Sequence, residues 1–236
     1  MWRRQAQGRT LTFHLAGINN QNFIMRDDQT GSFWQQADGV AISGPLAGSR
    51  LELVPMDELS FGLWKQESPQ GEVLAPVPAY VADYERKDWE DRMQKVPTVV
   101  SVSGTGLPAR ETVIGISLNG AARAFPLDKV LAQSPVQDSV GGSPIVLVAG
   151  PDGKSIRVFL SQLPGAQPAQ FFKSQPSQNN SGQWDLLDSA HANHWNFQGC
   201  ATSGPDLGKC LGEVPYLKDY WFDWRLYHPA TTVYAR

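Results

Sequence analysis

The sequence predicts a β-dominated α+β protein built from two related units of short antiparallel strands and hairpins, each closed by a short helix that contains tryptophan. The first observation is an internal copy, because residues 39–55 return as residues 199–215 with glycine and proline at matching places. The match continues downstream to Trp64 and Trp224. The second observation is that short runs of alternating polar and apolar residues lie between turn residues, which is typical of antiparallel strands.

The copy extends upstream when one residue of slippage is allowed. Asp27 then matches Asp188, and Trp34 matches Trp195. This organisation predicts three segments: residues 1–75 as the back half of a first repeat unit, 76–97 as a helical linker, and 98–236 as a complete second unit.

Composition restricts the class of protein. The chain has 236 residues, of which 41% are hydrophobic and 18% charged, so it is long enough to bury a core and is expected to fold. A formal net charge of −3 excludes the broad basic surface that binding to nucleic acid requires. No apolar run reaches the roughly 18 residues needed to cross a bilayer.

Local patterns predict the elements of the first unit and of its copy. Two strands are expected in residues 2–16 and a third in residues 22–26, followed by the hairpin around Gly44-Pro45. Asp57 is predicted to cap a helix over residues 58–66. The matching helix of the second unit, with four aromatic residues on one side, is predicted over residues 218–227 as a core-packing element.

The middle of the chain has clearer signals. Residues 80–96 read as a charge-rich helix with a solvated face, which ends before Pro97. Asn119-Gly120 is the strongest two-residue hairpin signal in the sequence. The strands expected around and after it are 113–118, 121–125, 136–140, 144–148 and 155–160, with a short helix over 126–133.

The two cysteines both lie in the second copy of the hairpin. If residues 203–208 form its turn, Cys200 and Cys210 face each other across the ladder, at a spacing from which a disulfide can close. The alternative is a pair of reduced thiols that replace Val40 and Arg50 of the first copy. The sequence leaves both states open.

Three histidines near the copied segment are weak candidates for a metal site. His191 and His194 are three residues apart, and His228 follows downstream. The first copy has no histidine at these places, so exposed loop histidines are the favoured interpretation, and the sequence predicts no metal and no cofactor.

Two pairs of charged residues could belong to a site. Asp27 and Asp188 hold equivalent loop positions and could serve acid–base chemistry, although turn capping is the favoured interpretation. Arg123 and Asp138 lie on neighbouring elements, where a charge pair that fixes strand register is favoured over a substrate clamp.

Taken in order, these motifs resemble the bacterial domain-of-unknown-function family numbered 3179, DUF3179. The resemblance covers nearly the whole chain. The chain would contain the back half of a first repeat unit, followed by the front half and the back half of a second repeat unit. The segments that carry it are Val113-Ile114-Gly115, Asn119-Gly120, residues 123–127, residues 136–144 and residues 27–36, with the Gly44-Pro45 hairpin and the helix before Pro69. The candidate pattern site that follows from the resemblance is Asp27, Trp34, Arg123, Asp138, Asp188 and Trp195.

The resemblance also implies a redox hypothesis. Many members of the family carry a Cys-Pro-x-Cys-type motif, in some a selenocysteine, where this sequence reads Ala149-Gly150-Pro151-Asp152-Gly153. The second unit would therefore be redox-inactive. In the first unit the motif would fall upstream of Met1, so we expect Met1 not to be the natural start. Location is extracytoplasmic by resemblance, and cytoplasmic if Met1 is the true start.

These observations lead to two functional hypotheses, and the sequence does not decide whether the chain is an enzyme. The first is an uncharacterised, non-catalytic binding or scaffold module made of degenerate tandem repeats. The alternative is a thiol or selenol redox protein whose reactive residue lies upstream of Met1. The partner is unknown, and self-association through exposed strand edges is expected.

Overall fold

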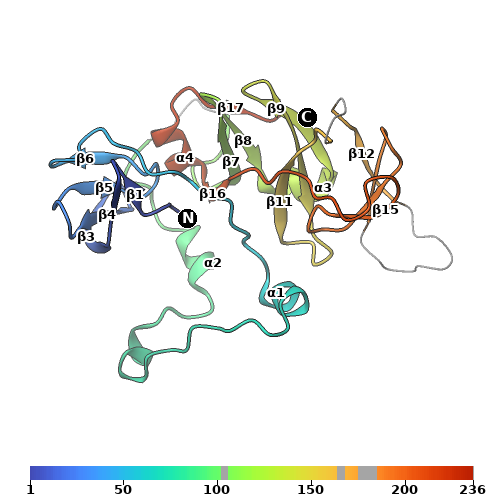
Figure 1. Cartoon of the computed structure of the whole chain (residues 1–236). Helices are drawn as coiled ribbons and strands as arrows, with labels where there is room; N and C mark the ends of the chain where they lie inside the picture. The colour runs from blue at the N-terminus through green and yellow to red at the C-terminus, as the bar shows by residue number, and fades with distance from the viewer. Residues whose placement is uncertain (102–105, 164–167, 175–184, 236) are drawn as a thin grey trace.

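A computed structural model of the chain describes residues 1–101, 106–163, 168–174 and 185–235. It confirms the β-dominated α+β class: most of the regular secondary structure consists of small, mainly antiparallel sheets, and the helices are short (Figure 1). None of the helices in the described residues is long and apolar enough to cross a membrane.

The strands are β1 (Gln5–Ala6), β2 (Arg9–Thr10), β3 (Phe13–Asn19), β4 (Asn22–Asp27), β5 (Phe33–Gln35), β6 (Ala41–Ser43), β7 (Thr112–Leu118), β8 (Ala121–Pro126), β9 (Val136–Val140), β10 (Ser143–Ala149), β11 (Ile156–Leu160), β12 (Phe171–Lys173), β13 (Leu186–Asp188), β14 (His194–Trp195), β15 (Ala201–Ser203), β16 (Leu217–Tyr220) and β17 (Thr232–Val233). The helices are α1 (Phe61–Glu67), the 3₁₀ helix η1 (Pro78–Asp83), α2 (Trp89–Met93), α3 (Leu127–Gln133) and α4 (Trp221–Tyr227).

Two four-stranded sheets, β3-β4-β5-β6 and β12-β13-β14-β15, have the same strand order and the same register. Trp34 pairs with Ala41 in the first sheet, and Trp195 pairs with Ala201 in the second. A β-bulge lies beside the tryptophan in both. Each tryptophan is fully buried at the centre of its own core cluster.

The one-residue slippage between the copies lies in the turn that follows the tryptophan strand. In the first sheet, Gly39 N donates to Gln35 O, whereas in the second sheet Gly199 N donates to Asn196 O. The first turn therefore contains one more residue, while the ladders on both sides keep the same pairing.

Helices α1 and α4 end in the same way. The residues that follow them, Ser68 and His228, have φ/ψ of −128°/67° and −126°/65°, and each donates its backbone N–H to a tryptophan carbonyl in its helix. The predicted helix starts were wrong. Ser60, and not Asp57, caps α1, because the Asp57 carboxylate binds Arg157 instead.

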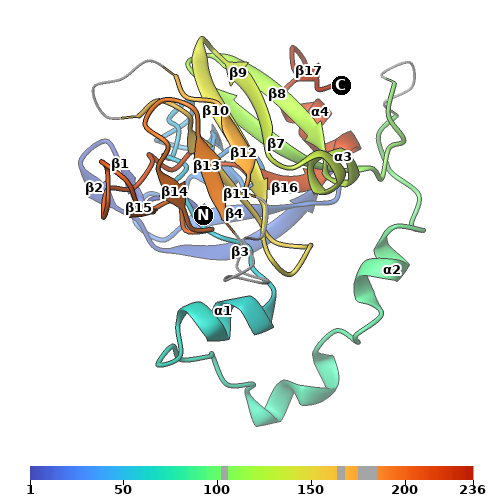
Figure 2. The same ribbon diagram turned by 90° about the vertical axis from the view of Figure 1, so that its right-hand side faces the viewer.

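The predicted start of the second helix was also too early, because residues 217–220 form strand β16 beside β7. The continuous helix predicted over 80–96 was wrong as well. That segment contains only the end of η1 and the short helix α2, separated by extended backbone at Tyr84 (φ −71°, ψ 144°). Neither helix buries a side chain, so tertiary packing does not favour a longer helix. In Figure 2 this segment runs outside the body of the molecule.

The strands β7 to β11 and the helix α3 lie close to where the sequence predicted them. Asn119 and Gly120 both have positive φ, 50° and 79°, as the two-residue turn between β7 and β8 requires. Sheet β16-β7-β8-β17 and sheet β11-β10-β9 enclose one core with α3. Trp221 and Trp224 of α4 pack on Val113 and Ala124, which confirms the expected core role of this helix.

Helix α1 follows the first four-stranded sheet in the chain but packs in the core cluster of the second one. Leu63 belongs to the same core cluster as Phe159 and Trp195. The buried Arg157 side chain of β11 bonds Asp57, which precedes α1, at 2.6 Å, and Glu67, the last residue of α1, at 2.7 Å. The division into segments 1–75, 76–97 and 98–236 stays a prediction, but this helix ties the first segment to the third.

Candidate functional site

Asp27 and Asp188 of the predicted pattern site are the last residues of β4 and β13, which are inner strands of two separate sheets. Trp34 Nε1 donates to Asp27 Oδ2 at 2.8 Å, and Trp195 Nε1 donates to Asp188 Oδ2 at 2.9 Å. Both carboxylates are 1% exposed. The structure does not bring Asp27 and Asp188 together, so they do not form an acid–base pair with each other.

Hydrogen bonds from the surrounding loop saturate Asp188. Although burial alone raises the pKa of Asp188, the backbone N–H of His191, the Trp195 indole and Asn193 hold that pKa below its ordinary value. Asp27 has a lowered pKa for the same reason, with Trp34 and Thr30 as donors. Carboxylates that are ionised, buried and fully bonded hold a loop in place and have no free lone pair aimed at a ligand.

Arg123 and Asp138 form a partly exposed pair that joins β8 to β9. Arg123 Nε lies 2.7 Å from Asp138 Oδ2, and Arg123 Nη1 donates to Thr232 Oγ1 of β17 at 3.1 Å. The guanidinium therefore connects three strands. This arrangement suits strand positioning, and no described cavity is lined by either residue.

The three candidate histidines do not converge. His191 Nδ1 lies 2.7 Å from Asp206, His194 Nδ1 contacts Asp185, and the His228 ring stacks on Trp224 at 3.7 Å. In the part of the chain that the structure describes, no group of three or more histidine, cysteine, aspartate or glutamate residues is arranged to hold a metal ion.

Cys200 and Cys210 are joined by a disulfide across the second hairpin, with Cα atoms 4.0 Å apart. Val40 and Arg50 occupy the same bridge position in the first hairpin. The two hairpins have the same ladder, so the disulfide is an addition to a hairpin that also forms without it.

A different pair of acids lines a cavity between the N-terminal part of the chain and the β16–α4 segment. Asp219 lies near the end of β16 and Asp223 lies in the first turn of α4. Their side chains are hydrogen-bonded to each other, and Asn22 of the first sheet donates to Asp223. The cavity, of about 420 Å³, is lined by Met1, Trp2, Asn22, Gln36, Ala37, Met56, Glu58, Tyr216, Leu217, Lys218, Asp219 and Asp223. We call it the acid-pair cavity.

The two carboxyl groups titrate together. Burial, followed by the negative charge of Asp223, raises the pKa of Asp219 to about 8. Burial also raises the pKa of Asp223, against the hydrogen bond from Asn22. Near neutral pH, the protonated Asp219 therefore donates a hydrogen bond to the Asp223 carboxylate. Such a pair can accept a cation in place of its proton, or transfer the proton to a bound group.

The first copy shows that the fold does not need these acids. Leu59 and Leu63 stand at the matching places before and in α1, where both pack on the core of the second unit. Sequence analysis missed Asp219 and Asp223 because they lie among aromatic core residues of the helix segment. The signal that could have found them is the replacement of two leucines by two acids between the copies.

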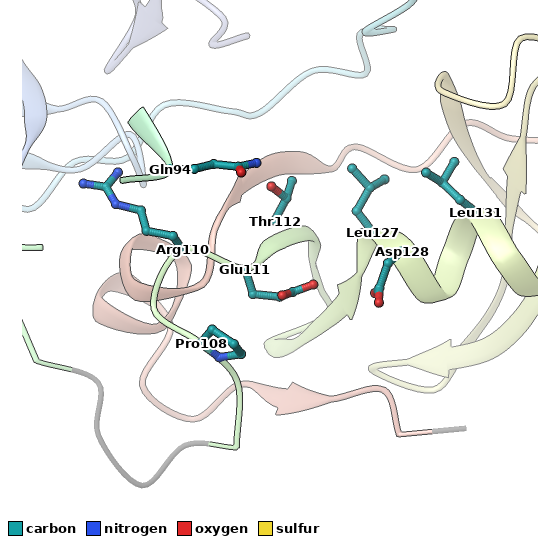
Figure 3. A pocket seen from close by; sticks show the side chains of 8 residues that line it. All are labelled: Gln94, Pro108, Arg110, Glu111, Thr112, Leu127, Asp128 and Leu131. Atoms are coloured by element: carbon teal, nitrogen blue, oxygen red, sulfur yellow. The ribbon is translucent and has the colours of Figure 1, made fainter. Parts of the chain in front are cut away.

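Two more cavities follow the acid-pair cavity, and each shares lining residues with the one before it. The first, of about 370 Å³, shares Glu58, Lys218 and Asp219 with it and is also lined by Trp89 of α2. The next, of about 400 Å³, is shown in Figure 3, where the Glu111 and Asp128 carboxylates lie toward the same space. Burial and then the charge of Asp128 raise the pKa of Glu111. Acidic groups therefore predominate along this side of the molecule.

The comparisons with known proteins identify the family. No curated protein and no solved structure matches the chain. The family model described as "Protein of unknown function (DUF3179)" matches residues 1–231, which is nearly the whole sequence. The resemblance drawn from the motifs is thereby confirmed, and the chain belongs to the DUF3179 family.

Proposed function

We propose that this chain is a non-catalytic binding module and that the acid-pair cavity binds a small organic amine. The observation that carries the proposal is the pair Asp219 and Asp223, which replaces two leucines of the first copy. Burial of two adjacent carboxyl groups opposes folding, because like charges cannot both ionise at low cost. Because the same fold forms with leucine at these two places, we infer that the acids serve to bind a ligand.

The walls of the cavity favour a cation over an anion. Lys218 Nζ is paired with Glu58 at 2.5 Å, so its charge is already balanced, while the acid pair keeps one net negative charge. Trp2 and Tyr216 supply aromatic surface of the kind that contacts ammonium groups. A volume of about 420 Å³ suits a small molecule.

The scaffold part of the proposal is an internal duplication. The matching registers, tryptophan–aspartate bonds and helix ends of the two units support descent from one unit. In this view the first unit keeps α1 as a packing element, and the second unit has converted the same helix position into a binding site. Self-association through strand edges stays a prediction.

Calorimetric titration with butylamine and 1,4-diaminobutane tests the proposal, with butanol and butanoate as neutral and anionic controls. We expect only the amines to bind, with release of a proton below pH 8, so that their affinity rises with pH by up to about tenfold per unit and then levels off. The double variant D219L/D223L, which carries the residues of the first copy, should lose at least tenfold in affinity.

The variant D128N is the matched control, because it removes an acid of the neighbouring cavity and should leave amine binding unchanged. Equal binding of butanol and butylamine, or full binding by D219L/D223L, would refute the amine site.

The redox alternative requires a reactive thiol or selenol. Both cysteines are joined in the Cys200–Cys210 disulfide, and Gly150 and Gly153 stand where the family resemblance implies sulfur. A thiol or selenol reaction would therefore need a reactive residue outside this sequence, or cycling of this one disulfide. The acid-pair cavity contains neither cysteine, so the amine site does not depend on that chemistry.

A further inference from the structure

The β3–β4 hairpin carries five apolar side chains on the same face as Trp34. Leu15 is opposite Met25 and Ile18 is opposite Phe23 in the ladder, and Met25 is in turn opposite Trp34. Leu15, Ile18 and Phe23 are 62%, 68% and 49% exposed. We call Phe13, Leu15, Ile18, Phe23 and Met25 the first-sheet patch.

The second sheet shows what covers the matching face. Phe171 and Leu186 hold the ladder positions of Phe13 and Met25, and they are 1% and 2% exposed. They belong to one core cluster with Val146 and Val148, which come from the middle strand of sheet β9-β10-β11. Phe13 and Met25 are only partly buried, against the cluster of the first sheet itself.

In the first copy, Trp2 occupies the place that Phe159, a residue of the covering sheet, occupies in the second copy. Trp2 bridges to Leu53 as Phe159 of β11 bridges to Glu213. The Trp2 ring also lies over Gly39 as the Phe159 ring lies over Gly199. A sheet placed on the first-sheet patch would therefore continue an interface that Trp2 begins.

The patch is more apolar than the fold requires. Lys173 of the second sheet holds the ladder position of Leu15, so a charged side chain is compatible with this place. A contiguous group of exposed apolar side chains on one face is typical of a protein interaction surface.

We propose that the first-sheet patch binds a separate polypeptide that presents a three-stranded antiparallel sheet with a strip of branched aliphatic residues, as Val146 and Val148 do in β10. A second folded copy of this chain cannot supply that strip. Both faces of its β10 are already buried, with Ile145 and Leu147 in one cluster and Val146 and Val148 in another. This inference is independent of the amine site.

The first experiment supplies the partner sheet to the full chain. Residues 106–163 are joined as an additional segment ahead of Met1 through a flexible Gly/Ser linker, and amide hydrogen exchange is measured across residues 13–25. We expect exchange in the β3–β4 hairpin to slow by at least tenfold. In the matched control, V146D and V148D are introduced in the added segment only, and the slowing should disappear. Unchanged exchange in the hairpin beside a protected added segment would overturn the proposal.

The second experiment uses the chain without the added segment. It therefore tests the role of the first-sheet patch even if the added segment does not fold. The triple variant L15K/I18T/F23K should keep its melting temperature within about 2 °C and bind several-fold less of a hydrophobic dye, because a docking surface contributes little to the fold of the free chain. A large loss of melting temperature would show a structural role. A wild-type dimer that the triple variant abolishes, measured by sedimentation, would assign the patch to self-association. Either result would refute the proposed partner.

Discussion

Trp224 of α4 packs directly on the backbone of Gly115 in β7, so that a Cβ atom on Gly115 would lie 2.2 Å from the indole ring. The variant G115A is therefore expected to push α4 away from the sheet and to lower the free energy of unfolding by about 1–3 kcal/mol. Urea denaturation checks this. A Cβ atom on Gly17 would meet no other atom within 4 Å, so G17A is the control and should change stability by less than about 0.5 kcal/mol. Equal stability of the two variants would contradict this packing.

The acid pair predicts a stability that falls as pH rises. The pKa of Asp219 is raised to about 8 in the folded chain, above its ordinary value, so folding is favoured most at low pH and this contribution is lost between about pH 4 and pH 8. The slope is at most about 1.4 kcal/mol per pH unit. The variant D219N should remove this slope, as followed by thermal unfolding at a series of pH values. A wild-type slope retained in D219N would place the titrating group elsewhere.

The tryptophan–aspartate bond predicts the opposite dependence on pH. The pKa of Asp188 is lowered, so its contribution to stability is present above the ordinary aspartate pKa and is lost as pH falls through the folded value. W195F removes one donor to a buried carboxylate, which should cost about 1–3 kcal/mol at pH 7 and move acid unfolding to higher pH. Circular dichroism during acid titration measures both effects. W89F, at a 41% exposed position, is the control and should behave as wild type.

The disulfide is expected to stabilise the second hairpin without determining its shape. The double variant C200V/C210R carries the residues of the first copy, Val40 and Arg50, which bridge in the same way. Loss of a cross-link over this short separation should cost about 2–3 kcal/mol in the chain-entropy description. Backbone NMR contacts across the hairpin should persist. Their disappearance would show that the disulfide holds the ladder in place.

Much of the fold could be predicted because its signals are local. Asn119-Gly120 marks a turn that needs positive φ at both residues, and the copied hairpins carry the same turn residues. The linker helix could not be predicted correctly from charge alternation. That pattern describes solubility, whereas a helix as short as α2 needs packing that Trp89, at 41% exposed, does not provide.

The candidate site was less predictable for a similar reason. Asp219 and Asp223 become an interacting pair only because β16 pairs with β7 and because Asn22 comes from a segment 201 residues away from Asp223 in sequence. The predicted residues Asp27 and Asp188 were correctly matched between the copies, since both copies need a buried acceptor for their tryptophan. The residues that match between the copies are therefore the buried tryptophan–aspartate pairs, and the proposed site lies where the two copies differ.

Helix α1 does not pack on the sheet that precedes it but contributes Leu63 to the core cluster that contains Trp195. Arg157 binds the helix segment there through ion pairs with Asp57 and Glu67. The two ends of the molecule are thus interlocked by contacts that do not pass through the exposed segment 76–97. Proteolytic cleavage within that segment should leave the two fragments associated under native conditions, and residues could be added to it or removed from it without separating the units.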